Sequence, residues 1–269
     1  MGIFESIILG LVQGLTEFLP VSSSGHLQIA KALLGVEIPD NLTFDVTLHV
    51  ATVLSTICIL HKEVFSLIKG VCKFQYNAET QYALKILLSM IPVGIVGFVF
   101  DDELNQMLAS PAILVIVGAM LLFTAALLTF ATYAKPRPKE TISYGNAFII
   151  GLSQAVASLP GLSRSGTTIA TGLLLGNKKE SVAQFSFLMV IIPILGKAFL
   201  DIISGDMAGS ISGPDGIGVG SLIAGFVAAF VSGAFACRFM IEIVKRSKLV
   251  WFAVYCAVVG SISIISYFI

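Results

Sequence analysis

The chain has 269 residues, of which 56% are hydrophobic and only 12% are charged, and its mean hydropathy is +0.95. This apolar share lies well beyond that of soluble globular domains, so the composition excludes that class and predicts an integral membrane protein. The 16 basic and 16 acidic residues leave no net charge, which gives no electrostatic basis for binding nucleic acid.

The first element is an apolar segment at 3–34 that is interrupted by the sequence LPVSSSG at 19–25. The parts on either side, 3–18 and 23–34, are both shorter than the roughly 20 residues that a helix needs to cross a membrane. A helix, a break and a second helix of this length predict a re-entrant hairpin, which enters the membrane and returns to the same side. Broken backbone is tolerated at that depth only where protein or a water-filled cavity satisfies its polar groups.

Further along the chain, apolar segments long enough to span a membrane alternate with polar loops. We expect six spans, at 43–60, 84–100, 112–133, 180–203, 219–241 and 249–269. Between the third and the fourth lies a second interrupted segment, 144–176, which carries LPGLSRSG at 159–166 and predicts a second re-entrant hairpin. The expected fold is therefore an all-α integral membrane protein with six spans and two re-entrant hairpins.

An internal repeat organises these elements, because the chain aligns with itself without a gap at an offset of 141 residues. The aligned pairs include Gly10 with Gly151, Gln13 with Gln154, Ser22 with Ser163 and Gly25 with Gly166. Polar residues and glycines among the matches favour a true duplication over chance similarity between apolar segments. We expect a first repeat at 1–134 and a second at 141–269, each consisting of a hairpin followed by three spans.

Lysine and arginine residues collect on one side of this arrangement. They follow the first span, join the two repeats, follow the second hairpin and precede the last span, whereas an opposite loop carries Asp101, Asp102 and Glu103. The positive-inside rule makes the basic side cytoplasmic, which puts both termini outside. Because three spans per repeat is an odd number, the second repeat is inverted, and the two hairpin tips meet near the membrane midplane.

The tip of the first hairpin concentrates polar side chains. Gln13 and Glu17 are four residues apart and share one helix face, where their oxygens suit a hard divalent cation, Mg²⁺ or Ca²⁺. An ionisable group at this depth costs about 2.5–3.5 kcal/mol on insertion scales and usually marks function. Ser22 or Ser23 can cap the helix that follows the break, and His26 then lies in its first turn.

The second tip adds Arg164 between Ser163 and Ser165, with Thr168 one turn further on. Helix N-termini bind anions, and arginine binds two phosphate oxygens at once in a bidentate contact. A serine or a histidine can attack phosphorus or orient a water molecule. The two tips together therefore predict a phosphate site, although the same serines can serve purely as helix caps.

The sequences QGLTEFLPVSSSGH and LPGLSRSGTT resemble the two signature segments of the undecaprenyl pyrophosphate phosphatase family, the bacterial membrane enzymes linked to bacitracin resistance. The resemblance covers essentially the whole chain. It implies hydrolysis of the lipid undecaprenyl diphosphate to undecaprenyl phosphate and inorganic phosphate, which recycles the carrier lipid for peptidoglycan synthesis. It also implies a location in the bacterial inner membrane among its lipids, with the active site open to the outer side.

Carried over by position, the resemblance implies that Glu17 is the metal-linked carboxylate with Gln13 as its partner. The catalytic residues it implies are Glu17, Ser23, His26 and Arg164, and the substrate-binding residues are Ser22, Ser163, Arg164, Ser165 and Thr168. Gln13 departs from many members of the family, which have a glutamate there, and this weakens any mechanism that needs two carboxylates on the metal. Attack by a serine with His26 as base and direct attack by His26 both remain open.

A transporter or flippase for a lipid phosphate is the alternative function, because inverted repeats, broken helices and polar groups near the membrane midplane are typical of transporters. Transport needs the arginine and the helix N-termini, but it does not need a carboxylate, serines and a histidine within ten residues, so hydrolysis is favoured. His49 and Asp45, one turn apart in the first span, are left between a structural and a functional role. The sequence also leaves open whether the chain is a monomer or a homodimer.

Overall fold

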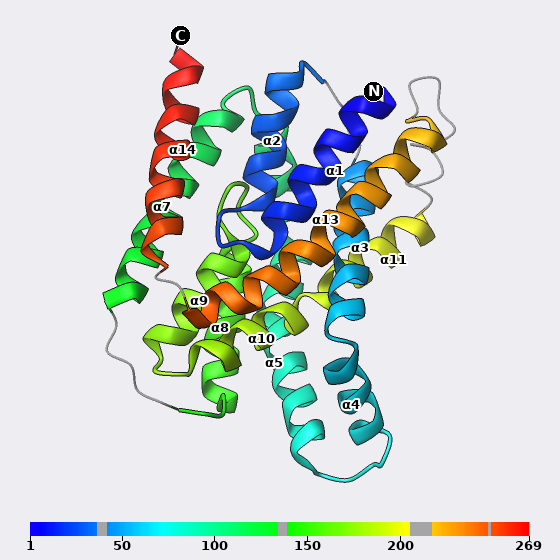
Figure 1. The fold of residues 1–269 in the computed structure, drawn as a ribbon, viewed down its shortest axis with the longest axis vertical. Coiled ribbons are helices and arrows are strands. Elements are labelled where there is room, and N and C mark those ends of the chain that lie inside the picture. The colour runs from blue at the N-terminus through cyan, green and yellow to red at the C-terminus, as the bar shows by residue number, and fades with distance from the viewer. Residues whose placement is uncertain (37–41, 134–138, 205–216, 247–248, 269) are drawn as a thin grey trace.

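The computed structural model describes residues 1–36, 42–133, 139–204, 217–246 and 249–268. Every regular element within these ranges is a helix. The N-terminal half contains α1 (Ile3–Phe18), α2 (Ser23–Leu34), α3 (Leu42–Ile59), α4 (His61–Val71), α5 (Ala78–Val99), α6 (Asp101–Leu108) and α7 (Ile113–Tyr133). The C-terminal half contains α8 (Tyr144–Val156), α9 (Arg164–Leu174), α10 (Lys179–Met189), α11 (Ile191–Ser204), α13 (Val219–Arg246) and α14 (Val250–Phe268) (Figure 1).

Several of these helices are long and apolar enough to cross a membrane, as the sequence predicts. The candidate spans in the described part of the chain are Ala78–Val99, Ile113–Tyr133, Lys179–Ile203 (which combines α10 and α11), Val219–Met240 and Val250–Phe268. A sixth candidate is the pair Thr43–Ile59 and His61–Val71, which passes the same test only as a unit and bends by 81°. The prediction of an all-α, multi-pass membrane protein is thus confirmed at this level, and the expected span 43–60 corresponds to α3.

The expected span 180–203 contains a break. α10 ends at Met189 and α11 begins at Ile191, with Pro193 in the first turn of α11. A proline fits the first turn of a helix, where an N–H group has no partner within the helix, whereas in a helix interior it removes a backbone hydrogen bond. The sequence around Pro193 therefore starts a new helix.

Each interrupted segment forms two short helices joined by a loop. α1 ends two residues before Pro20, and α2 begins after Ser22, whose side chain accepts a hydrogen bond from the Gly25 N–H at 3.2 Å. In the second segment Ser163 caps α9 in the same way, accepting from the Gly166 N–H at 3.1 Å. Figure 1 shows the two loops side by side in the middle of the molecule, with α1 and α2 extending towards one end and α8 and α9 towards the other.

Small residues allow the helices to approach one another closely. A Cβ atom added at Gly14 of α1 would meet the side chain of Ser232 and the carbonyl oxygen of Ala229 in α13, and one at Gly10 would meet the Gly225 carbonyl. Similarly, Gly151 of α8 lies against the backbone of α5 at Ser89, and Gly118 of α7 lies against Gly260 of α14. Close approach at small residues is typical of helices that pack within membranes.

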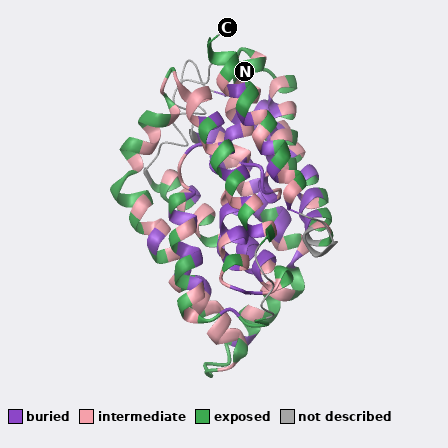
Figure 2. Cartoon of the chain, turned by 90° about the vertical axis from the view of Figure 1, so that its left-hand side faces the viewer, coloured by how far each residue is buried: buried purple, intermediate pink, exposed green. Residues whose placement is uncertain are grey.

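Buried and exposed residues are separated between the centre of the helix bundle and its outer faces. Figure 2 shows buried residues gathered in the centre and exposed residues on the outer helix faces. Phe44 and Phe185 are both fully buried, whereas Phe98, Phe130 and Trp251 are 78%, 68% and 72% exposed. Large apolar side chains on the outside of a chain this hydrophobic are expected to face lipid.

We expect Gly14→Val to lower the stability of the folded protein, because the new side chain has no room between α1 and α13. Overpacking of this kind costs about 1–3 kcal/mol or more. The measurement is thermal unfolding of the purified protein in detergent. The matched control is Gly97→Val in α5, where no atom beyond the neighbouring backbone of the same helix lies within 4 Å of the added Cβ. Equal melting temperatures for the two variants would contradict the proposed close packing.

Candidate active site

The two loops between the helix pairs contact each other directly. Ser24 Oγ accepts a hydrogen bond from the Gly161 N–H at 3.4 Å, and Ser165 Oγ donates to the Leu19 carbonyl at 2.9 Å. Gly161 has a φ of +88°, and a Cβ atom there would lie 2.6 Å from Val117 Cα. Both its backbone conformation and the proximity of α7 therefore require a glycine at this turn.

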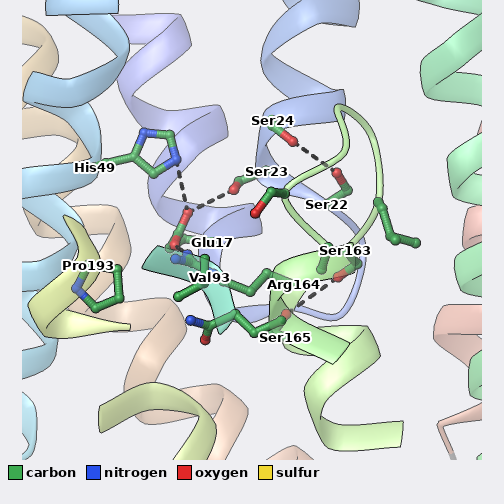
Figure 3. Close-up of a pocket in the computed structure, with 14 residues that line it drawn as sticks. Glu17, Ser22, Ser23, Ser24, His49, Val93, Ser163, Arg164, Ser165 and Pro193 are labelled. Carbon is green, nitrogen blue, oxygen red and sulfur yellow. Dashed lines mark hydrogen bonds and ion pairs between the residues drawn. The ribbon is translucent and has the colours of Figure 1, made fainter. Parts of the chain in front are cut away.

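A cavity of about 210 Å³ opens between the loops. Polar side chains from both loops line it, together with residues of α3, α5, α8 and α11 (Figure 3). The lining residues are Glu17, Ser22, Ser23, Ser24, His49, Val93, Gln154, Ala157, Ser158, Leu162, Ser163, Arg164, Ser165 and Pro193. The structure thus brings the serines of both predicted tips, the glutamate and the arginine to one place.

Glu17 is the centre of this polar group, with only 4% of its side chain exposed. Its Oε2 accepts hydrogen bonds from Gln13 Nε2 at 2.6 Å and from Ser23 Oγ at 2.7 Å. Its Oε1 accepts from Arg164 Nη2, which forms a salt bridge between the two loops. Since burying a carboxylate is costly unless it is paired and hydrogen-bonded, these contacts explain how the charge is tolerated.

The residues around Arg164 hold the start of α9. Ser163 is fully buried; its backbone N–H donates to Thr124 Oγ1 of α7 at 3.2 Å. Thr168 Oγ1 donates to the Arg164 carbonyl at 2.9 Å and lies 2.6 Å from Ser186 Oγ of α10. Thr168 is not among the residues that line the cavity, so its predicted contact with substrate remains a prediction.

His26 lies outside the cavity lining. Its Nδ1 is 2.7 Å from the Ser22 carbonyl oxygen, and its Nε2 is 2.7 Å from the Tyr255 hydroxyl of α14, with the two rings stacked. Ser22 has a φ of +71°, a left-handed conformation that is unfavourable for serine. In this arrangement His26 holds the strained loop in place, and its predicted role in attack or proton transfer remains a prediction.

His49 and Gln154 are polar cavity residues to which the sequence analysis assigned no role in the site. His49 Nε2 of α3 lies 3.7 Å from Glu17 Oε2 (Figure 3), a contact that arises from helix packing and leaves no local sequence signal. Gln154 of α8 is 2% exposed, and its Oε1 has no hydrogen-bond partner among the described residues. The internal repeat could have identified Gln154, because it aligns with Gln13 at the same offset that aligns the two tips.

The donor atoms near Glu17 fit a hard divalent cation. Gln13 is fully buried, and its Oε1 lacks a hydrogen-bond partner within the described residues. Carboxylate and amide oxygens are ligands that Mg²⁺ and Ca²⁺ prefer, with phosphate oxygens and water completing the coordination. The described residues contain no group of three or more His, Cys, Asp and Glu side chains placed to hold a metal. Any cation at Glu17 therefore depends on amide, substrate or water oxygens as well.

The arrangement as a whole suits a phosphorylated ligand. A guanidinium and the N-termini of α2 and α9 attract anions, and serine hydroxyls can donate to phosphate oxygens. Next to them the Glu17 carboxylate accepts a hydrogen bond from the Ser23 hydroxyl, a geometry that allows proton transfer from the hydroxyl to the carboxylate. The cavity can therefore both bind a phosphate group and support its chemistry.

Comparison with known proteins gives a consistent result. The family model described as bacitracin resistance protein BacA matches residues 6–262. The chain is 60% identical over 262 residues to an undecaprenyl-diphosphatase of Bacteroides fragilis, with 97% of each chain covered, and 58% identical over 268 residues to one of Parabacteroides distasonis, with 98% covered. It is also 36% identical over 282 residues to an undecaprenyl-diphosphatase of Desulfatibacillum aliphaticivorans, covering 98% of this chain and 99% of that protein.

We expect Glu17→Gln and Arg164→Gln each to destabilise the protein. The double variant should lose less stability than the sum of the two single losses. Each single change leaves a buried charge without its partner, which costs about 3 kcal/mol, whereas the double variant removes both charges. A double-mutant cycle of thermal unfolding in detergent measures this coupling.

The control for this cycle is the exposed pair formed by Lys178 and Glu140, whose Nζ and Oε1 atoms are 2.6 Å apart. The hydrogen bond from Lys178 lowers the pKa of Glu140, but solvent screens the pair. Its coupling should therefore be much smaller. Additive effects of the Glu17 and Arg164 changes would show that the two charges do not stabilise each other.

Proposed function

The chain belongs to the bacitracin resistance protein BacA family, and we propose that the cavity between its two loops is where it hydrolyses undecaprenyl diphosphate to undecaprenyl phosphate and inorganic phosphate. The observation that carries this assignment is the meeting of Glu17 and Arg164, from loops far apart in sequence, beside two helix N-termini. The reaction regenerates the lipid carrier of cell-wall synthesis and underlies the bacitracin resistance for which the family is named.

Binding of the diphosphate begins at Arg164. Its side chain is 26% exposed, so it can reach a ligand in the cavity while the Glu17 side chain stays buried. A diphosphate competes with Glu17 for the guanidinium, because arginine binds phosphate oxygens in a bidentate manner. The hydroxyls of Ser22 and Ser163 and the N–H groups at the starts of α2 and α9 supply further donors, and the Ser165 hydroxyl adds one when it leaves the Leu19 carbonyl. The isoprenoid tail remains among the membrane lipids.

Ser23 is the nucleophile that the geometry favours. Its hydroxyl donates to Glu17 Oε2, which can accept the proton as Oγ bonds to the terminal phosphorus. The bond from this phosphorus to the bridging oxygen breaks, and undecaprenyl phosphate leaves with that oxygen. Water then adds to the phosphorus, Ser23 regains a proton from this water as its bond to phosphorus breaks, and the proton held by Glu17 leaves to solvent with the inorganic phosphate.

His26 provides the competing assignment, as a base or a direct nucleophile. For either role its ring has to leave the Tyr255 hydroxyl and turn towards the cavity, since both ring nitrogens have partners in the structure. Trapping the phosphorylated enzyme and identifying the modified residue separates the two schemes.

A divalent cation, Mg²⁺ or Ca²⁺, completes this proposal. Glu17 and the unpartnered Oε1 of Gln13 would hold it. When bound, the cation supplies positive charge that offsets the negative charge of the diphosphate.

We further propose that each loop with its two helices is a re-entrant hairpin and that 1–134 and 141–269 are inverted repeats. The helix contacts support this, because α1 packs on α13 and α8 packs on α5, which are equivalent pairs at the offset of 141 residues. Likewise α7 packs on its own equivalent, α14. The site needs residues of both hairpins from one chain, so a homodimer is not required for its assembly.

The orientation that we propose puts both termini outside the cytoplasm of a bacterium, in its inner membrane. The exposed residues Lys62, Lys69, Lys73 and Tyr76 lie on α4 and the loop that follows it, at the end of the molecule away from both termini (Figure 1). Lysines in short loops are typical of the cytoplasmic side of a membrane. The proposal also has the cavity opening to the outer side, as the two signature segments imply.

The expected result for the purified protein is release of phosphate from undecaprenyl diphosphate that stops when EDTA is added. Glu17→Gln, Ser23→Ala and Arg164→Gln should each lower kcat by about 10²-fold or more, because each loses a charge or hydroxyl that acts in the reaction. Melting temperatures identify variants that merely fail to fold. Absence of phosphate release by well-folded wild-type protein, with Mg²⁺ and Ca²⁺ each supplied, would favour a lipid phosphate transporter instead.

Gln154→Ala should raise KM more than it lowers kcat. Gln154 lies in the cavity lining, and its Nε2 group can donate a hydrogen bond to a phosphate oxygen of a bound ligand. Loss of one hydrogen bond to a charged phosphate weakens binding by about 1.5–3 kcal/mol, which is roughly tenfold or more in KM. Gln28→Ala on α2, away from the cavity, is the matched control. Unchanged KM in Gln154→Ala would remove this residue from the binding site.

A further inference from the structure

The tautomer of His49 is fixed by its surroundings. Its Nδ1 lies 2.7 Å from the Asp45 backbone carbonyl oxygen, which can only accept a hydrogen bond. The ring proton of a neutral His49 is therefore on Nδ1, and the lone pair is on Nε2. A ring held in this way by a backbone carbonyl is the common arrangement of histidines that bind metals.

Nε2, which carries the lone pair, lies 3.7 Å from Oε2 of Glu17. His49 and Glu17 both line the cavity. Gln13 is not among the lining residues, but its Nε2 donates to the same carboxylate and its Oε1 has no hydrogen-bond partner among the described residues. Metal–ligand distances of about 2.0–2.2 Å allow two ligands of one ion to be up to about 4 Å apart. The observed separation lies within that range.

We propose that His49, Glu17 and Gln13 form a mixed nitrogen and oxygen site that binds a first-row transition cation such as Mn²⁺ more tightly than Mg²⁺ or Ca²⁺. This inference rests on the proposed function, because it refines the cation site of the same cavity. The site is open on the cavity side, where water and phosphate oxygens complete the coordination. It is formed by helices α1 and α3, so the ligands are on rigid elements rather than on the loops.

The predicted preference follows from the nitrogen ligand. Imidazole binds first-row transition cations, whereas Mg²⁺ and Ca²⁺ select oxygen ligands. The residues behind His49 keep its ring in place, since Asp45 Oδ2 pairs with Lys31 Nζ of α2 at 2.7 Å and ties this turn of α3 to the first loop's helices. Outer partners of this kind commonly contribute 10–100-fold to metal affinity, by orienting the ligand.

The alternative explanation of the same distance is a direct ion pair between a protonated His49 and Glu17. In that arrangement Nε2 carries a proton and has no lone pair for a metal. The two explanations differ in whether nitrogen is bound to the cation, which spectroscopy detects without turnover.

The experiment uses the full-length protein in detergent, without substrate, titrated with Mn²⁺ and followed by electron paramagnetic resonance. We expect one site per chain with hyperfine coupling to a histidine nitrogen. His49→Gln should abolish the coupling and weaken Mn²⁺ binding by about tenfold or more. The affinity for Mg²⁺, measured by its competition with Mn²⁺, should change little, because glutamine offers an oxygen in place of the nitrogen.

The matched control is His61→Gln. His61 also has its Nδ1 near a backbone carbonyl oxygen, that of Cys58 at 2.9 Å, but it is exposed at the start of α4 and outside the cavity. It should keep both the nitrogen coupling and the Mn²⁺ affinity of the wild type. Glu17→Gln provides a second test, since it should also weaken Mn²⁺ binding.

Absence of Mn²⁺ binding, absence of nitrogen coupling, or equal Mn²⁺ affinity in His49→Gln and wild type would each overturn this inference. Phosphate release by the wild type with Mg²⁺ is measured alongside and separates the two proposals. If hydrolysis persists while the nitrogen coupling is missing, only the mixed ligand set is wrong. If Mn²⁺ binds through His49 but no phosphate is released, the proposed function fails and the metal site remains.

Discussion

The salt bridge between Glu17 and Arg164 is the interaction on which the arrangement of the site depends. Neither charge is tolerated easily inside a chain whose mean hydropathy is +0.95, because burial removes most of the water that would solvate it. The two residues are 147 positions apart, one at the end of α1 and the other at the start of α9, so the pair forms only when both loops reach the same depth. A shift of either loop along the axis of the molecule would leave a carboxylate or a guanidinium unpaired. The electrostatic requirement therefore fixes the relative position of the two helix pairs.

Helix packing makes this position attainable. α1 can carry Glu17 to the centre because Gly10 and Gly14 let it lie directly against α13, and Gly161 lets the second loop pass close to α7. Small residues at these contacts replace the hydrophobic driving force that is absent between helices in lipid. The hydrogen bonds between the loops, from Gly161 to Ser24 and from Ser165 to Leu19, then satisfy backbone groups that a lipid environment could not. Polar chemistry at the centre is thus supported by tight backbone packing around it.

The sequence predicted the helices and the two polar loops better than it predicted the neighbours of each side chain. Pro20 and the serine caps have local effects on the backbone, so the ends of α1 and α2 could be read from the residues themselves. His49 could not be assigned, because its contact with Glu17 comes from the packing of α3 on α1. For His26 the sequence predicted a place in the site, because it lies close to the serines. In the structure the ring instead hydrogen-bonds to Tyr255, 229 positions away, and lies outside the cavity lining. The predicted span 43–60 ends where α3 ends, but the sequence analysis did not predict the helix α4 that follows it at an angle of 81°.

The same salt bridge suggests how substrate and product are distinguished. Without ligand, Glu17 accepts from Gln13, Ser23 and Arg164, so the carboxylate is fully engaged and the nucleophile that we propose is held against it. A diphosphate can compete for Arg164 because it brings more negative charge than one carboxylate, and its binding frees part of Glu17 for a cation or a proton. Undecaprenyl phosphate has lost one phosphoryl group and competes less well. Glu17 can then recover the guanidinium, so the contact that stabilises the empty site also favours release of the product.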